Sequence, residues 1–184
     1  MTNKVFEACL KVIERDGWKG FSFAKASQDS GIPLSVFHEQ FSSPSEVMIH
    51  LFKIIDQAVL KNLDSYEDLS PKDALFDILM NRFEAALPYK TILKSFWGDW
   101  IMNPLEAPAF ACHGFSSMAW MLEAAGLESR GIKGFLRVQG ITTLYLLTLK
   151  TWLADDSPDL GKTMATLDKG LLKLERAARI LNGF

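Results

Sequence analysis

Apolar residues recur at helical spacing along most of the chain. Near the start, Val5, Cys9 and Ile13 form one such stripe over residues 3–15, and Asp16-Gly17 ends it. Apolar and polar residues do not alternate with a period of two between hairpin turns, which is the pattern typical of strands. The sequence therefore predicts an all-α protein with about nine helices.

Residues 21–48 have the pattern of a helix-turn-helix. A first short helix is expected to begin at Ser22, whose hydroxyl can cap it, and to end at Gly31, which tolerates the left-handed conformation of a helix end. A second short helix is expected from about Pro33 to Phe41, since proline suits a first helical turn. Together with the helix over residues 3–15, these elements predict a small helical head.

Serine followed by proline marks the start of three later helices. The segment Ser43-Pro44-Ser45-Glu46 combines a cap, a proline for the first turn and an acidic residue three positions after the cap. The helix that it opens is expected to continue to about Leu63, and the same signal recurs at Ser70-Pro71 and Ser157-Pro158. The later helices are expected over residues 70–86, 89–102, 104–125, 133–153 and 157–181.

Composition and charge favour a globular protein without a membrane span. The chain has 184 residues, 48% of them hydrophobic, and a net charge of −2, so any contact with DNA must come from a local patch. Its two cysteines, Cys9 and Cys112, lie in apolar helical patterns and are expected to be buried thiols in a reducing compartment. No signal peptide and no apolar run of about 20 residues is found, so a cytoplasmic location is expected.

Motifs of catalysis are missing from the sequence. It contains no glycine-rich phosphate loop, no paired metal-ligand motif and no nucleophile elbow, and it has only three histidines. Asp155, Asp156 and Asp159 cluster before the last helix, where they are expected to favour its positive N-terminus; a divalent-cation site is the alternative. We therefore predict no enzyme activity, no catalytic residue, no metal and no cofactor.

The middle of the chain is rich in aromatic side chains and methionine. One interpretation is an apolar ligand pocket with a few orienting polar groups, and the other is that these residues are simply core. The candidate ligand-binding residues are Trp97, Trp100, Phe110, His113, Met118, Trp120, Met121, Gln139 and Tyr145.

The last two helices predict a homodimer. The final helix has an apolar face that includes Met164, Leu167, Leu171 and Leu174, and it spans more turns than a lone surface helix needs. The helix over residues 133–153 is equally apolar. Two such helices from each chain can form a four-helix bundle, so we expect a dimer through these helices.

The head resembles the tetracycline-repressor-like (TetR) family of transcriptional regulators. The resemblance rests on the segment FSFAKASQDSGIPLSVFHEQFSSPSEVM and covers about the first 50 residues, with matching positions Ala26, Gly31, Ile32, Phe37, Phe41 and Ser43. It implies a DNA-binding-like head over residues 1–47, a ligand-binding and dimerisation body over residues 48–184, and a repressor that a small apolar ligand releases from DNA. The residues that would then face DNA are Ser22, Lys25, Ser35, His38 and Gln40.

A second resemblance gives the alternative function. The segment WLADDSPDLGKTMATLDKGLLKLERAARI is similar to the C-terminal region of ubiquinone-biosynthesis accessory proteins, which keep a TetR-like fold while binding lipid instead of DNA. Between Gly31 and Phe41 the chain has no lysine or arginine, although phosphate contacts dominate affinity for DNA. The alternative hypothesis is therefore a lipid- or isoprenoid-binding accessory protein of TetR fold that has lost DNA binding.

Overall fold

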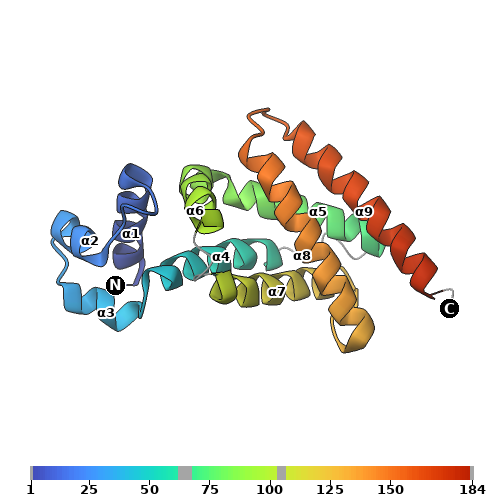
Figure 1. The fold of residues 1–184 in the computed structure, drawn as a ribbon, viewed down its shortest axis with the longest axis horizontal. Coiled ribbons are helices and arrows are strands. Elements are labelled where there is room, and N and C mark those ends of the chain that lie inside the picture. The colour runs from blue at the N-terminus through green and yellow to red at the C-terminus, as the bar shows by residue number, and fades with distance from the viewer. Residues whose placement is uncertain (1, 62–67, 103–106, 183–184) are drawn as a thin grey trace. The chain divides into compact units, whose positions relative to one another are not determined.

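The structure, a computed structural model, describes residues 2–61, 68–102 and 107–182 (Figure 1). Over these residues the chain forms nine α-helices and no strand, which confirms the all-α prediction. A short 3-10 helix, Leu87–Tyr89, directly follows α5. The α-helices are α1 (Thr2–Asp16), α2 (Phe23–Ser30), α3 (Leu34–Gln40), α4 (Pro44–Leu60), α5 (Pro71–Ala86), α6 (Lys90–Met102), α7 (Ala107–Ala124), α8 (Gly131–Leu153) and α9 (Gly161–Asn182).

The chain divides into two compact units. The first contains Met1–Ile54 and Pro88–Ala111, and the second contains Ile55–Leu87 and Cys112–Phe184. Helices α4 and α7 each contribute residues to both units. Within the described ranges, no helix combines the length and the apolar character that crossing a membrane requires.

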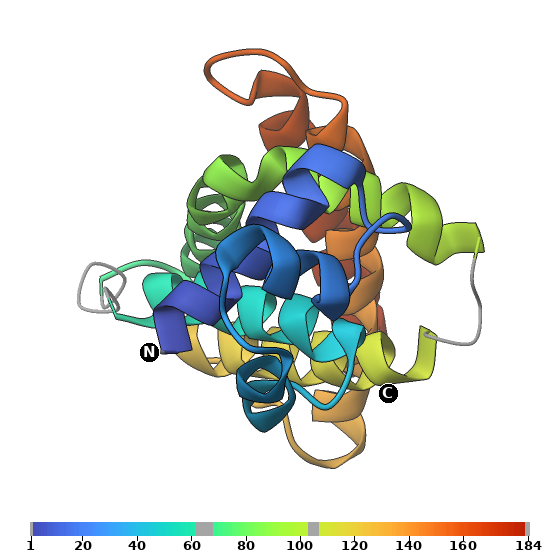
Figure 2. The ribbon, with the colours of Figure 1, turned by 90° about the vertical axis from the view of Figure 1, so that its left-hand side faces the viewer.

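The helix-turn-helix has the expected local structure. Ser22 accepts a hydrogen bond from the Lys25 amide at 3.3 Å and caps α2, and Gly31 ends α2 with a φ of 69°. Phe37 is completely buried and anchors α3 against the other helices of the head. Figure 2 looks onto α1, α2 and α3, and α2 contacts both of its neighbours.

Helix α6 belongs to the same unit as this head. The Trp18 amide donates to Ser95 Oγ at 2.8 Å, and the Lys19 amide donates to Asp99 Oδ2 at 3.1 Å. The Trp18 ring also meets Phe96 edge-on, with centroids 5.3 Å apart. The turn after α1 is therefore held by a helix that comes much later in the chain.

In the second unit, α8 and α9 pack along each other (Figure 1). Glycine permits the close approach: a Cβ built at Gly170 would lie 2.0 Å from Leu144 Cδ1, and one at Gly140 would lie 3.1 Å from Leu174 Cδ2. Helix α5 contacts both α8 and α9. Trp152 and Phe83 are fully buried in this core.

Two sequence-based expectations were wrong. Helix α9 begins at Gly161 and not at Ser157, because Leu160 takes a left-handed φ of 52° and the cap comes from Asp155, which accepts the Thr163 amide at 2.9 Å. Cys112 is exposed, since α7 directs residues such as Met118 into the core and Cys112 lies outside that face. Leu63, the expected end of α4, lies outside the described residues.

Candidate functional site

Helix α3, the second helix of the helix-turn-helix, presents a neutral to acidic surface. Ser35, His38 and Glu39 are exposed, and Leu34 is 50% exposed. The helix has the sequence LSVFHEQ and so contains neither lysine nor arginine. A helix that enters the major groove with this surface would make few charge-assisted contacts to phosphate.

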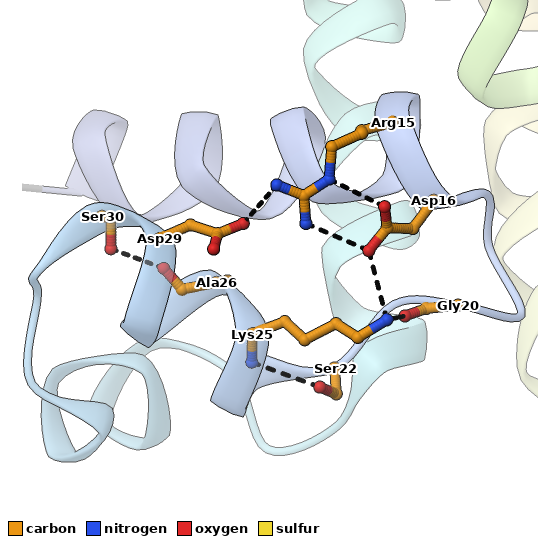
Figure 3. A network of polar contacts seen from close by, with 8 residues as sticks. All are labelled: Arg15, Asp16, Gly20, Ser22, Lys25, Ala26, Asp29 and Ser30. Atoms are coloured by element: carbon orange, nitrogen blue, oxygen red, sulfur yellow. Dashed lines mark hydrogen bonds and ion pairs between the residues drawn. The ribbon is translucent and has the colours of Figure 1, made fainter.

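Two cations of the head, Arg15 on α1 and Lys25 on α2, are bound to carboxylates of the head itself (Figure 3). Arg15 contacts Asp16 through Nε at 2.7 Å and Asp29 through Nη1 at 2.7 Å. Lys25 Nζ lies 3.1 Å from Asp16 Oδ2 and donates to the Gly20 carbonyl oxygen at 2.8 Å. Asp16 therefore connects α1 with α2 through two positive side chains.

Asp16 keeps its negative charge under ordinary conditions. Hydrogen bonds from Arg15 and then from Lys25 hold the pKa of Asp16 well below its usual range. The carboxylate thus compensates positive charge at the start of α2, where the resemblance places a contact with DNA. These pairs are exposed, so they orient the side chains more than they stabilise the fold.

The five predicted DNA-facing residues have different surroundings in the structure. Ser22 caps α2, and Lys25 is held by Asp16 and Gly20. Ser35 and His38 lie exposed on α3, while Gln40 is half-buried.

The second unit contains a buried network of polar side chains from four helices. Arg82 of α5 donates from Nε to Asp56 Oδ1 of α4 at 2.8 Å, from Nη1 to the Tyr145 hydroxyl of α8, and from Nη2 to Ser117 Oγ of α7 at 3.4 Å. His113 Nε2, also from α7, lies 4.0 Å from Asp56 Oδ2. Arg82 and Asp56 are only 5% and 8% exposed. We call these five residues the Arg82 network.

The Arg82 network combines an ion pair with a buried phenol. The guanidinium carbon of Arg82 lies 4.5 Å from the centroid of the Tyr145 ring, which also stacks on Phe83 with centroids 5.0 Å apart. Burial raises the pKa of the Tyr145 hydroxyl, although Arg82 acts in the opposite direction. The phenol therefore stays protonated, while Asp56 compensates the charge of Arg82.

Sequence reasoning identified His113 and Tyr145 but missed Arg82, Asp56 and Ser117. A signal for Arg82 is present in α5: Arg82 follows Ile78 by one helical turn and so falls on the buried face that Ile78 and Leu79 define. An arginine on the apolar face of a helix indicates a buried partner of opposite charge. Neither Asp56 nor Ser117 stands out in this way, because both types are common on exposed helix faces.

The remaining predicted ligand-binding residues are divided between the two units. Trp97 and Phe110 belong to the first unit, whereas Met118 and Met121 are buried in the second. Trp120 and Gln139 are exposed, and the side chain of Trp100 lies outside the described residues.

The structure was compared with solved structures of other proteins. It superposes on the crystal structure of the TetR transcriptional regulator from Nitrosomonas europaea ATCC 19718 with a TM-score of 0.78. The superposition covers 94% of this chain and 97% of that chain, at 16% sequence identity. The chain has a TetR-like fold. Neither the models of known protein families nor the curated protein sequences gave a match.

The TetR-like fold assigns the two sites to different parts of the chain. The helix-turn-helix of α2 and α3 lies in the first unit, and all five residues of the Arg82 network lie in the second. Among the described residues, no group of histidine, cysteine and acidic side chains could hold a metal ion. The chain of TetR-like fold therefore has a helix-turn-helix in one unit and a buried polar network in the other.

Proposed function

We propose that this protein is a TetR-like transcriptional regulator that acts as a repressor, binds DNA as a dimer and is released from it by a small apolar ligand. The observation that supports this most directly is the helix-turn-helix itself, with a Ser22 cap, a left-handed Gly31 and a buried Phe37, in a chain of TetR-like fold. Ser35 and His38, both exposed on α3, would read base edges.

The dimer would form through α8 and α9. Leu147 on α8 is 61% exposed and Met164 on α9 is 41% exposed, so each helix has apolar surface that a partner could cover. A second copy that covers this face by two-fold symmetry would bury both residues in a four-helix bundle. A dimer would also place two helix-turn-helix motifs on neighbouring half-sites of an operator.

The ligand would act at the Arg82 network. Buried charged groups cost free energy, and their replacement by apolar residues is often neutral or stabilising, so their presence favours a role beyond stability. The Arg82 network joins α4, α5, α7 and α8 by side-chain contacts. A ligand that exchanges one of these contacts for its own polar group would shift the helices, and the rest of its surface would meet aromatic residues such as Phe83.

Fluorescence anisotropy with the purified full-length protein tests DNA binding. The probe is a labelled duplex of the DNA upstream of the protein's own gene, titrated at several salt concentrations. We expect binding that weakens as salt rises. Replacing both Ser35→Glu and His38→Glu should abolish it, while the exposed Ser116→Glu in the second unit should not. If the wild-type protein shows no salt-dependent binding at low ionic strength, the regulator proposal fails.

The second candidate is a lipid-binding accessory protein of the same fold. The observation that favours it is the charge of the head: α3 carries no lysine or arginine, and both Arg15 and Lys25 are held by carboxylates. Its test is mass spectrometry of an organic-solvent extract of the purified protein. The candidate predicts a stoichiometric isoprenoid or fatty lipid, and a preparation that carries no lipid would argue against it.

A further inference from the structure

The end of the Arg82 side chain faces neutral partners inside the second unit. Its ion pair with Asp56 uses Nε, at 2.8 Å, whereas Nη1 donates to the Tyr145 hydroxyl and Nη2 to Ser117 Oγ at 3.4 Å. The contact from Nη2 is at the long end of the hydrogen-bond range. Nη1 and Nη2 form a fork that can bind both oxygens of a carboxylate. A negatively charged acceptor would therefore bind this fork more strongly than two hydroxyl groups do.

The two hydroxyl groups have protons to donate. A hydroxyl that accepts a hydrogen bond still carries its own proton, and burial raises the pKa of Tyr145, so that its proton is kept. Among the described residues, neither Tyr145 nor Ser117 has a hydrogen-bond partner other than Arg82. Both are buried, at 8% and 2% exposed, where a donor without an acceptor costs free energy. More donors than acceptors thus lie around the end of Arg82.

The surroundings of this donor group are apolar. The Phe83 ring stacks on Tyr145 with centroids 5.0 Å apart, and it also meets the Trp152 ring with centroids 5.7 Å apart. Met118 and Met121 of α7 are buried in the same unit, and methionine side chains adapt to irregular space. A site that combines clustered donors with such surroundings suits a molecule with one polar end and an apolar body.

We propose that the Arg82 network binds the carboxylate of a fatty-acid-like molecule, that is, one carboxylate on an apolar chain. Arg82 Nη1 and Nη2 donate to its two oxygens, and Tyr145 and Ser117 turn their hydroxyl protons toward the same group. Asp56 keeps its hydrogen bond from Arg82 Nε. An alcohol of the same length fits less well, because it has no charge and offers a single oxygen.

A second carboxylate beside Asp56 calls for a second positive charge, because two carboxylates in one buried site repel each other. His113 Nε2 lies 4.0 Å from Asp56 Oδ2. A protonated His113 would pair with Asp56 while Arg82 pairs with the ligand. The other two members of the network, Tyr145 and Ser117, are neutral. His113 thus completes the charge balance of the occupied site.

This inference rests on the proposed action of a ligand at the Arg82 network, and it adds the chemical class of that ligand. It does not depend on DNA, because a regulator and a lipid-binding accessory protein could bind the same acid. Absence of salt-dependent DNA binding would refute the regulator and leave the acid site standing. DNA binding by a protein that binds no acid would refute the acid site alone.

Isothermal titration calorimetry with the full-length protein tests the proposal. The probes are octanoate, decanoate and dodecanoate, each matched with the alcohol and the methyl ester of the same chain length. We expect saturable binding of at least one acid. Its alcohol and its methyl ester should bind at least about tenfold more weakly, because charge-assisted hydrogen bonds are about twice as strong as neutral ones. With an isotope-labelled carboxyl carbon, the NMR shift of the bound acid should be that of the ionised form.

Variants of the donors show whether the acid binds at this site. Tyr145→Phe keeps the ring on Phe83 and removes only the hydroxyl, and Ser117→Ala does the same on α7. Each should weaken binding of the acid by about fivefold to tenfold and change binding of the alcohol much less. Arg82→Lys keeps the charge but has no fork, and His113→Gln cannot take up a proton. Both should weaken binding of the acid by at least about tenfold.

The matched control is Thr148→Val. It removes another buried hydroxyl of α8, one that donates to the Leu144 carbonyl oxygen of its own helix. This variant should bind the acid like the wild type. Near-ultraviolet circular dichroism checks the packing of each variant. If Arg82→Lys folds poorly, the two hydroxyl variants still decide the question, because each loses a single oxygen atom.

Any of four results would overturn the proposal. The first is absence of saturable binding for all three acids, and the second is equal affinity for an acid and its alcohol. The third is an equal loss of binding in Thr148→Val and in the two hydroxyl variants. The fourth is a bound carboxyl carbon with the NMR shift of the neutral acid, because the ligand would then form no ion pair with Arg82.

Discussion

At the scale of single residues, Asp16 limits the positive charge of the head at the start of α2. Its carboxylate binds both Arg15 and Lys25. If the head contacts phosphate, Asp16→Asn should strengthen binding at low salt and steepen the logarithmic salt dependence by about 1, because one more cation is available. The measurement is anisotropy over a salt series.

The control for this prediction is Glu7→Gln. It removes the same charge from an exposed site on α1 and should leave the salt dependence unchanged. Equal affinity for Asp16→Asn and the wild type would mean that Lys25 does not contact DNA.

The loss of Arg82 should lower stability strongly. Arg82→Met leaves the buried Asp56 without its ion pair, so we expect the free energy of unfolding to fall by about 3–5 kcal/mol. The double variant Asp56→Leu and Arg82→Met removes both charges and should lose far less than the sum of the single variants. Urea denaturation measures all four proteins. Additive losses would show that the two side chains act independently.

The caps of α2 and the Arg82 network differ in how well sequence can predict them. Ser22 and Gly31 act within a few residues of themselves, and the structure confirms both. The Arg82 network depends on partners 26, 35 and 63 residues away, and only the periodicity of α5 signals that Arg82 faces inward. Local chemistry is thus readable from sequence, whereas the partners of a buried charge are set by tertiary packing.

At the scale of elements, the start of α9 depends on Asp155. Its Oδ1 accepts from Ser157, and its Oδ2 accepts from the amide and the hydroxyl of Thr163. The side-chain hydrogen bond from Ser157, followed by those from Thr163, holds the pKa of Asp155 below its usual range. The ionised carboxylate therefore stabilises the folded state.

Asp155→Asn should lower the thermal midpoint at neutral pH, because an amide group would face the donors that the carboxylate accepts. The unfolded pKa of aspartate is about 3.9 and the folded pKa is lower, so this stabilisation is present above about pH 4 and is lost as the pH falls further. The difference between variant and wild type should accordingly shrink in acid. Calorimetry from neutral to acidic pH measures it, and a constant difference would assign the effect to packing alone.

The helix starts show where sequence patterns succeed and where they fail. Ser70-Pro71 caps α5 as predicted, with Ser70 accepting the Asp73 amide. Ser157-Pro158 has the same signature, yet it lies in a turn before α9. The difference arises because the Ser157 hydroxyl donates to Asp155, and Asp155 itself accepts the amide of Thr163, the third residue of the helix. A second acceptor a few residues upstream is enough to move a helix start.

At the scale of the whole molecule, the proposed dimer makes a direct prediction. Leu147→Glu would place two carboxylates in an apolar interface, at a cost of at least about 2 kcal/mol, or a factor of about 30 in the dissociation constant. The wild type should be a dimer in light scattering, and the variant should dissociate at concentrations where the wild type does not. Leu34→Glu, on a side chain of α3 that is 50% exposed, should remain dimeric. A monomeric wild type would refute the interface.

The first unit should not fold from its N-terminal segment alone. Residues 1–54 without 88–111 would lose the hydrogen bonds from Trp18 and Lys19 to α6, together with the aromatic contact to Phe96. We expect a fragment of residues 1–54 to lack the near-ultraviolet circular dichroism of a packed tryptophan. A fragment with dispersed amide resonances in its NMR spectrum would contradict this. No local pattern predicts these contacts, because they join residues 77 and 80 positions apart.

The chain passes from one unit to the other at three points, and each of them lies inside a helix. These points are within α4, at the 3-10 helix after α5, and within α7. An experimenter who wishes to transplant the head onto another body therefore cannot cut at a single linker. A working graft must exchange two separate stretches, 1–54 and 88–111, and keep three helical junctions in phase. Recombination in nature meets the same obstacle, so this head and body are expected to be inherited as one piece.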